Sequence, residues 1–404
     1  MKQWNWLVLV AGMMLLGGVA HAGERFALEV FPTEQQKMVD DQTGAELMFI
    51  TTDPAWEHNL YFHEWSWLAD SSMVLFYSKR EKGGLMGYLT ATGELVRLET
   101  PSGGLGNASA AVYRNSVYAT RGRDAIELAL EMEISPDPAK QPSRVWATER
   151  FIATLPEGSA GALNPNCNGK WLACGVFKGK DGSPAKVIRI NIKSGAVKTV
   201  CEIPKNQEFS YHVQWSHEKP YLLSFAAIHP RLNVVDVRNG RIQNPYIELP
   251  GELVTHEHWW VDDQIAFCGG LHTKPKEDAH VKVVNIHTGQ VRIIGAGAWW
   301  EGATPEQLAK CNHWHCAGSD DGRWVVSDNW YGDLWLHEGK TTRSFLLTQG
   351  HRTYGKGDHP EMGWDRKGEK IVFCSHKLGN PNVCIVTIPK QIQDANLTPK
   401  RLKK

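Results

Sequence analysis

Short runs of β-branched and aromatic residues, each following a polar turn, recur along almost the whole chain. In the clearest copies an aromatic residue leads through a turn rich in Asp, Asn or Gly into a strand, as in Trp67–Tyr77 and Trp364–Phe373. Seven copies occur, starting at Trp67, Ala111, Leu163, Trp215, Trp260, Ser319 and Trp364. These starts lie 44 to 59 residues apart, the length of a four-stranded blade with variable loops. The pattern therefore predicts an all-β fold, a seven-bladed β-propeller.

A second turn signal follows several copies and has the form strand, Thr/Ser/Asn-Gly, strand. It stands at residues 91–93, 193–195, 238–240 and 287–289. Glycine supplies the positive φ angle of tight hairpins, so these positions predict turns within the blades. Residues 125–132 and 304–309 have helical character instead, and we expect both as helices in loop insertions. Two packed β-sandwiches are the rival architecture, which the regular sevenfold spacing disfavours.

The chain begins with a segment typical of a secretory signal peptide. Lys2 precedes an apolar run over residues 6–19, which ends in the small-x-small sequence of residues 20–22. We expect cleavage after Ala22, a propeller domain over residues 23–395 and a basic tail over residues 396–404. No later stretch approaches the roughly 20 apolar residues of a spanning helix, so we expect no transmembrane segment. The sequence thus predicts a soluble protein, periplasmic or secreted, and a monomer or loose homo-oligomer.

The composition argues against nucleic-acid binding and allows disulfides. The 44 basic residues are balanced by 44 acidic ones, so no overall field attracts nucleic acid, and the basic C-terminus is most simply a solvated tail. The 17 tryptophans fit packing between blades. Eight cysteines in an exported chain allow disulfides. Cys374 and Cys384 flank a turn and Cys311 and Cys316 bracket two histidines, but either pair could also be free thiols.

Histidines concentrate just before four consecutive copies of the repeat. They are His212, His256, His258, His313, His315 and His359, the last accompanied by Glu361. In a propeller such loops lie at the mouth of the central channel, so four blades would direct imidazoles toward one axis. Imidazole is the commonest metal ligand and titrates near neutrality. We interpret the set as a catalytic or metal site.

Spacing within the set predicts pairs of ligands. Side chains two residues apart on a strand point to the same side of the sheet. Three pairs could therefore each direct two side chains toward one site: His256 with His258, His313 with His315, and His359 with Glu361. Two imidazoles and a carboxylate suit Mn²⁺, Zn²⁺ or another divalent ion. Each pair could equally be one ligand and one structural residue.

The segment Thr255–Trp259, with sequence THEHW, resembles a motif of the oligogalacturonate lyases, metal-dependent seven-bladed propellers that cleave short pectin fragments. The resemblance covers nearly the whole mature chain and is better from about residue 211 onward. It implies that His256 is the catalytic base. It also implies that Arg231, 25 residues earlier, contacts the substrate.

The same resemblance implies a metal site, with departures. His315 precedes an Asp-Gly turn at the family's distance, and His359 matches the first histidine of the family motif Gln-x-x-His-Pro-His-Pro. Glu361 replaces the second histidine and Lys356 replaces the glutamine. The implied ligands are therefore His315, His359 and Glu361, with Mn²⁺ expected and Zn²⁺ or Ca²⁺ as alternatives. The lost ligand and the signal peptide leave the identity of the uronate polymer open.

A mechanism by β-elimination follows as a hypothesis. The C5 proton of a 4-linked uronate is hard to remove because the adjacent carboxylate resists more negative charge, which a cation and Arg231 would offset. Neutral His256 would accept the proton. Residues expected to contact the substrate or support the ligands are His212, His258, His313 and His351. The alternatives are a lyase for another acidic glycan such as ulvan, and a non-catalytic binding propeller resembling TolB.

Overall fold

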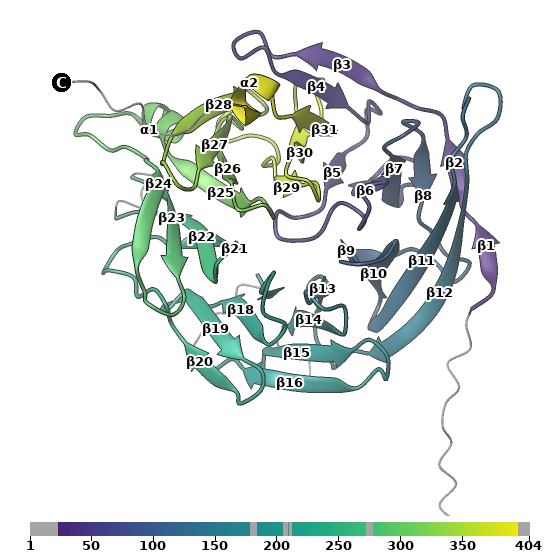
Figure 1. The fold of residues 1–404 in the computed structure, drawn as a ribbon, viewed down its shortest axis with the longest axis horizontal. Helices are drawn as coiled ribbons and strands as arrows, with labels where there is room; N and C mark the ends of the chain where they lie inside the picture. Colours follow the sequence, from purple (N-terminus) through teal and green to yellow (C-terminus); the bar gives the residue numbers. More distant parts are fainter. Residues whose placement is uncertain (1–22, 178–183, 205–208, 210–211, 272–277, 395–404) are drawn as a thin grey trace, which may run out of the picture.

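Seven antiparallel sheets stand in a ring around a central axis (Figure 1). The structure is a computed structural model that describes residues 23–177, 184–204, 209, 212–271 and 278–394. The expected signal peptide and basic tail lie outside the described residues. The prediction of an all-β, seven-bladed β-propeller is confirmed.

The first four blades follow one another along the chain, and each begins with its innermost strand. Blade one contains β5 (Glu57–Asn59), β6 (Met73–Ser78), β7 (Gly84–Leu89), β8 (Leu95–Arg97) and β2 (Glu29–Phe31). Blade two contains β9 (Gly106–Ala110), β10 (Ser116–Arg121), β11 (Asp124–Glu133), β12 (Arg144–Thr154) and β1 (Arg25–Ala27). Blade three contains β13 (Asn164–Pro165), β14 (Trp171–Val176), β15 (Lys186–Asn191) and β16 (Val197–Glu202). Blade four contains β17 (Gln214–Trp215), β18 (Leu222–Ala226), β19 (Leu232–Asp236) and β20 (Arg241–Gln243).

The last three blades complete the ring, and the N-terminal part of the chain closes it. Blade five contains β21 (Thr255–Trp259), β22 (Gln264–Gly269), β23 (His280–Asn285) and β24 (Val291–Gly295). Blade six contains β25 (His313–Gly318), β26 (Trp324–Asn329), β27 (Leu334–Glu338) and β28 (Ser344–Thr348). Blade seven contains β29 (Gly363–Trp364), β30 (Lys370–Ser375), β31 (Asn382–Thr387), β4 (Glu46–Phe49) and β3 (Gln36–Val39). Its outer two strands come from the N-terminal part of the chain and its inner three from the C-terminal part, so the two ends of the propeller are hydrogen-bonded to each other.

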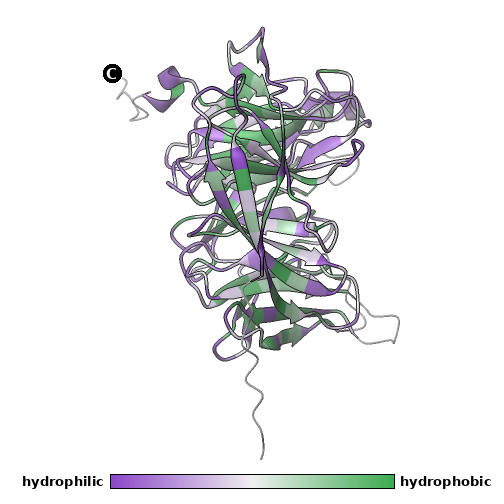
Figure 2. Cartoon of the chain, turned by 90° about the vertical axis from the view of Figure 1, so that its right-hand side faces the viewer, coloured by the Kyte–Doolittle hydropathy of each residue, from purple (hydrophilic) through white to green (hydrophobic). Residues whose placement is uncertain are grey.

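The hydrophobic core lies between neighbouring blades. Trp215 of blade four, for example, packs in one cluster with Ala173 and Val187 of blade three. Inner strands such as β18 are buried at every position, because each sheet is covered on both faces. Hydrophobic colour accordingly runs along the strands, while many connecting turns are hydrophilic (Figure 2). Four of the largest fully buried side chains are tryptophans, as their expected packing role requires.

The turns predicted inside the blades are confirmed. Each of the four sites joins the third and fourth strands of a blade, and its glycine has a positive φ: 80° at Gly93, 69° at Gly195, 75° at Gly240 and 67° at Gly289. The helix expected at 304–309 is also confirmed as α1 (Pro305–Cys311), where Thr304 and Gln307 form a capping box.

Residues 125–132 were expected to be helical, and this prediction is wrong. They belong to β11, which pairs with β10 on one side and β12 on the other. The segment is rich in Ala, Glu, Leu and Met, which favour helices, but pairing on both edges and burial against blade one outweigh that preference. The other helix, α2 (Lys390–Gln393), follows the last blade. Neither helix of the described chain has the length and apolar character needed to cross a membrane.

The eight cysteines are free thiols. Cys374 pairs with Val383 across the hairpin of β30 and β31, and Cys384 pairs with Phe373. Residues in register share a face of the sheet, so the two cysteine side chains point to opposite faces and cannot form a disulfide. Cys311 is exposed whereas Cys316 is buried, so no bridge joins the second pair either.

Closure by β4 should be critical for stability. Leu47 is 1% exposed and pairs with Val386 of the last blade. We expect Leu47→Ala to lower the free energy of unfolding by about 2 to 5 kcal/mol, since a buried leucine leaves a cavity. Val39→Ala in the neighbouring β3, where the side chain is 57% exposed, is the control and should change little. Urea unfolding followed by tryptophan fluorescence measures both, and equal midpoints for the two variants would contradict this account of closure.

Candidate functional site

Two β-bulges bring histidines of adjacent blades together. In β21 the register shifts between Thr255 and His258, and in β25 it shifts between His313 and Cys316. A bulge places two residues opposite one and re-aims a side chain. The residues re-aimed here are His256 and His315, whose ring centroids lie 3.9 Å apart. The site therefore depends on a local break in the regular strands.

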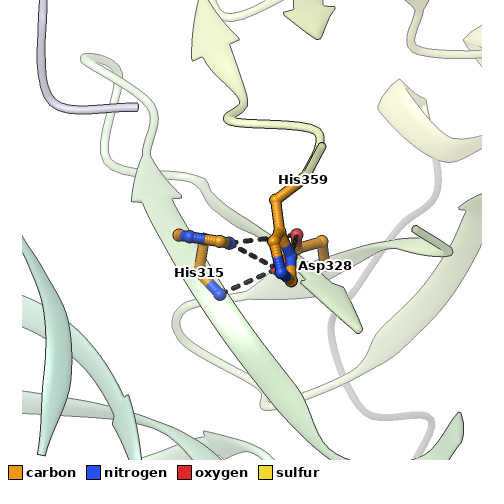
Figure 3. A group of neighbouring side chains, drawn as sticks. All are labelled: His315, Asp328 and His359. Atoms are coloured by element: carbon orange, nitrogen blue, oxygen red, sulfur yellow. Dashed lines mark hydrogen bonds and ion pairs between the residues drawn. The ribbon is translucent and has the colours of Figure 1, made fainter. Parts of the chain in front are cut away.

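A carboxylate joins two of the histidines in a group suited to a metal ion (Figure 3). His315 comes from β25, Asp328 from β26 and His359 from the loop before β29, and their ligand atoms all lie within 4.8 Å of one another. Asp328 accepts from Nδ1 of His315 at 3.0 Å and lies 3.5 Å from Nδ1 of His359. Glu361 contributes a second carboxylate, 3.2 Å from Nε2 of His315. Two imidazoles and two carboxylates thus share one small volume.

The two carboxylates of this group stabilise positive charge beside them, whether on a histidine or on a bound cation. Burial alone would lower the pKa of His315, but Glu361 and Asp328 raise it to about 10. Burial would likewise raise the pKa of Asp328, yet His315 and His359 hold it below its ordinary value. One oxygen of Glu361, Oε2, is buried without a hydrogen-bond partner in the described structure. The group therefore carries spare negative charge and a free ligand atom.

His256 is held as a neutral imidazole. Burial, together with the nearby His315 and His212, keeps its pKa well below the ordinary value. Its Nδ1 lies 2.7 Å from the carbonyl oxygen of Trp314, to which it donates a proton as the neutral tautomer. The opposite nitrogen, Nε2, then carries the lone pair. His256 is thus arranged as a proton acceptor at neutral pH.

A second network surrounds His212. Its Nδ1 lies 2.9 Å from Oε2 of Glu257, and its Nε2 lies 3.1 Å from the hydroxyl of Tyr61. Arg231 donates through Nε to Glu257 at 2.5 Å. Burial would raise the pKa of Glu257, but Arg231 and His212 lower it to about 2. Glu257 is therefore ionised and fixes the orientation of its neighbours.

Phe62 fills the space between the histidines. Its ring lies 5.6 Å from that of His256 and 5.7 Å from those of His212 and His315, and its side chain is 2% exposed. The segment that carries it connects β5 to β6 and reaches into the centre of the ring (Figure 1). The inserted phenyl ring removes water from the histidine cluster, which accounts for the lowered pKa values around it.

Two cavities flank this segment. One, of about 320 Å³, is lined by residues that include Tyr61, Glu64, Asn107 and His212. The other, of about 470 Å³, shares Tyr61, Glu64 and Asn107 and extends to Lys79. Trp56 of the second cavity donates to Asp358 at 2.7 Å, so that cavity adjoins the loop that holds His359. The two cavities adjoin at these shared residues and are together called the cleft, and His212 is the site histidine that lines it.

Three site residues have unusual backbone conformations. φ is 32° at His212, 53° at His256 and 51° at Glu361. A residue other than glycine pays about 1 to 3 kcal/mol for such a conformation, and these conformations cluster at functional sites. The strained backbone at these three residues thus lies where side chains from different blades meet.

Not all the predicted residues reach this site. The structure brings together His212, Arg231, His256, His315, His359 and Glu361. His258 lies on the far side of Phe62 against His217, and His313 turns to Ser327. The expected pairing of residues two apart on β21 and β25 fails because each bulge separates its two histidines.

His351 is also remote from the cleft. It is 1% exposed, and its two ring nitrogens bond the hydroxyls of Thr348 and Ser375. Burial lowers its pKa to about 3, so it is a neutral imidazole within the sheet interior. Its geometry gives no route to a substrate, contrary to the expectation from its place in the sequence.

Four important residues escaped the sequence analysis. Asp328, Tyr61 and Glu257 have the contacts given above, and Arg352 lies against His359 with Nη1 2.9 Å from Nδ1. Glu257 stands inside the THEHW segment, so its place could have been noticed. Asp328 lies within β26, one residue before its end, and Tyr61 lies in a loop with no repeat signal, so only the fold reveals them.

Solved structures with a similar fold include two lyases. An oligogalacturonate lyase in complex with manganese matches with a TM-score of 0.71 and 16% identity, over 92% of this chain and 99% of that one. An oligogalacturonate lyase from Vibrio parahaemolyticus matches with a TM-score of 0.67, also at 16% identity and with the same coverage. No protein-family model and no curated protein matches the sequence. At this identity the likeness establishes the fold, and it confirms the architecture that the resemblance implied.

Glu257 should make the free energy of unfolding depend on pH in the acid range. Its pKa is lowered from 4.5 to about 2 in the fold, so its contribution is complete above about pH 4.5 and is lost as the pH falls toward 2. Each pKa unit is worth about 1.4 kcal/mol, so Glu257→Gln should cost about 3 kcal/mol at pH 7 and progressively less below pH 4. Urea titrations at several pH values measure the difference, with exposed Glu157→Gln as the control. A Glu257→Gln penalty that does not change with pH would contradict the assignment.

Proposed function

We propose that this chain is an exported lyase that cleaves an acidic, 4-linked uronate oligosaccharide or polysaccharide by β-elimination in the periplasm or outside the cell. The observation that carries the proposal is the contact between neutral His256 and the His315, Asp328 and His359 group. A proton acceptor and a cation-binding group in contact are what the removal of a proton beside a carboxylate requires. The fold shared with two oligogalacturonate lyases supports the same reaction class.

The residues present fit a divalent cation. His315, Asp328 and His359 offer nitrogen and oxygen ligands, and the unpartnered Oε2 of Glu361 offers a fourth. This mixture of hard oxygen and borderline nitrogen donors suits Mn²⁺, and also Zn²⁺. Asp328 would supply a further oxygen ligand in this chain, where Lys356 stands at the position of the family motif's glutamine. When bound, such an ion would neutralise the substrate carboxylate and so acidify the C5 proton.

His256 is the proposed base. Its Nδ1 is committed to the carbonyl of Trp314, so Nε2 is the nitrogen that accepts the proton. The lowered pKa keeps this nitrogen unprotonated over the neutral range, at the cost of a weaker base. An ion held by the neighbouring His315 group would offset this weakness, since it would make the substrate proton more acidic.

Arg231 and Lys79 support an acidic substrate. Arg231 donates through Nε and Nη2 to Glu257, and its Nη1 has no hydrogen-bond partner among the described residues. That remaining donor is available to a substrate carboxylate. Lys79 lies over the ring of Trp56 at 4.5 Å, and within the described chain it has no carboxylate partner. Positive charge thus stands at the cleft wall at Lys79 and beside the cleft residue His212 at Arg231, which suits a chain with a carboxylate on each sugar.

Metal binding should depend on Asp328. We expect wild-type protein to hold about one divalent ion per chain, and Asp328→Asn to weaken Mn²⁺ binding at least tenfold, about 1.4 kcal/mol. Titration calorimetry and elemental analysis measure affinity and content. Asp137→Asn, at an exposed position, is the control. Absence of a stoichiometric ion in the wild type would favour a non-catalytic binding propeller.

Activity should require His256. Incubation with polygalacturonate, its oligomers, ulvan and glycosaminoglycans, with and without a chelator, should give the ultraviolet absorbance of an unsaturated uronate for at least one substrate. We expect His256→Ala to lower kcat by about 10²- to 10⁴-fold, the usual contribution of a general base, while metal content is retained. His287→Ala at an exposed surface site is the control. Full activity of His256→Ala would exclude it as the base.

A further inference from the structure

Tyr61 occupies the junction of the cleft. It lines both cavities, and it comes from the segment that enters the ring between β5 and β6. Its side chain is partly exposed, whereas the neighbouring Phe62 is buried. Its hydroxyl hydrogen-bonds to His212, whose ring centroid is 5.6 Å from that of His256. The Tyr61 hydroxyl therefore links the cleft, through His212, to the histidines around His256.

The hydrogen bonds around Tyr61 have a defined direction. Glu257 is ionised and only accepts, so Nδ1 of His212 donates to it at 2.9 Å. Nε2 of the neutral ring must then accept, and the Tyr61 hydroxyl donates to it at 3.1 Å. Carboxylate, imidazole and hydroxyl thus form a hydrogen-bonded relay that fixes the position of the phenol oxygen. Here the relay ends at a phenol that faces the cleft.

We propose that Tyr61 is the proton donor to the departing sugar oxygen, with His212 and Glu257 holding its hydroxyl in position. This inference rests on the proposed lyase function and completes it, since an alkoxide is a poor leaving group unless a proton reaches it. In this scheme His256 accepts the C5 proton and Tyr61 donates a proton to the leaving oxygen.

The proton balance closes without a co-reactant. The C5–H bond breaks and its proton goes to Nε2 of His256, while the electron pair forms the C4–C5 double bond. The C4–O4 bond breaks, O4 keeps that pair and takes the hydroxyl proton of Tyr61. The imidazolium of His256 and the phenolate of Tyr61 return to their starting states by exchange with solvent. No net proton is consumed, and no atom is oxidised or reduced.

Two other groups could donate the proton. Nε2 of His212 carries a lone pair in the tautomer fixed by Glu257, so that ring has no proton to give toward the cleft. Glu64 also lines both cavities, and burial raises its pKa to about 8, so it holds a proton near neutrality. We favour Tyr61 because its hydroxyl is hydrogen-bonded to His212, whose ring is 5.6 Å from that of His256, whereas no hydrogen bond joins Glu64 to these histidines in the described structure. Glu64→Gln tests the rival directly.

The test compares leaving groups. On a natural 4-linked uronate, Tyr61→Phe should lower kcat by about 10²- to 10⁴-fold, with KM changed by less than about threefold. On a uronate whose C4 leaving group is fluoride or an aryl oxide, which departs without a proton, the same variant should lose less than about tenfold. Tyr113→Phe, on an exposed turn, is the matched control. Retained metal content and unfolding midpoint show that the variant is folded.

The possible results distinguish the Tyr61 proposal from the Glu64 alternative and from failure of the lyase function itself. An equal loss on both substrates would overturn the proposal and leave Tyr61 with a packing role against Phe62. Full activity of Tyr61→Phe beside a large loss in Glu64→Gln would overturn it in favour of Glu64. A wild-type protein that yields no unsaturated product from any uronate would overturn the lyase function and this inference together. Only selective loss on the poor leaving group supports Tyr61.

Discussion

Ring closure is the constraint on which the rest of the structure depends. Because β4 pairs with β31, the seven innermost strands must point their starts at one mouth of the channel. Residues separated by more than 140 positions, such as His212 and His359, are thereby gathered around a single axis. The hydrophobic layers between blades supply the energy for this arrangement, and the site residues contribute strain to it. A small number of positive φ angles is tolerated because the ring fixes the surrounding strands.

Buried charge is distributed unevenly around the gathered histidines. On one side Arg231 and Glu257 neutralise each other and hold His212. On the other side Asp328 and Glu361 carry two negative charges, of which a protonated His315 offsets one. His256 lies between the two groups and remains neutral because burial and its cationic neighbours oppose protonation. Because of this asymmetry, the side with Asp328 and Glu361 attracts cations, whereas the side with His212 and Glu257 is suited to proton transfer.

The sequence sufficed for the architecture and for part of the site. Strand periodicity and glycine turns are local properties, so the seven blades and their hairpins could be predicted, as could the approach of His256, His315 and His359. The segment 125–132 could not, because its helical preference is overridden only by strands distant in sequence. The bulges in β21 and β25 likewise have no local signal, so the roles expected for His258 and His313 followed from an alternation that the fold breaks. Asp328 and Tyr61 become visible only when separate blades are placed side by side.

The central claim is that this site breaks a sugar chain by elimination rather than by adding water. Mass spectrometry of the products formed from a uronate oligosaccharide in heavy-oxygen water distinguishes the two most directly. Elimination predicts product masses that sum to the mass of the substrate, with a vinyl proton at C4 and no heavy oxygen in either fragment's new end. Incorporation of one heavy oxygen per cleavage would show hydrolysis and contradict the account.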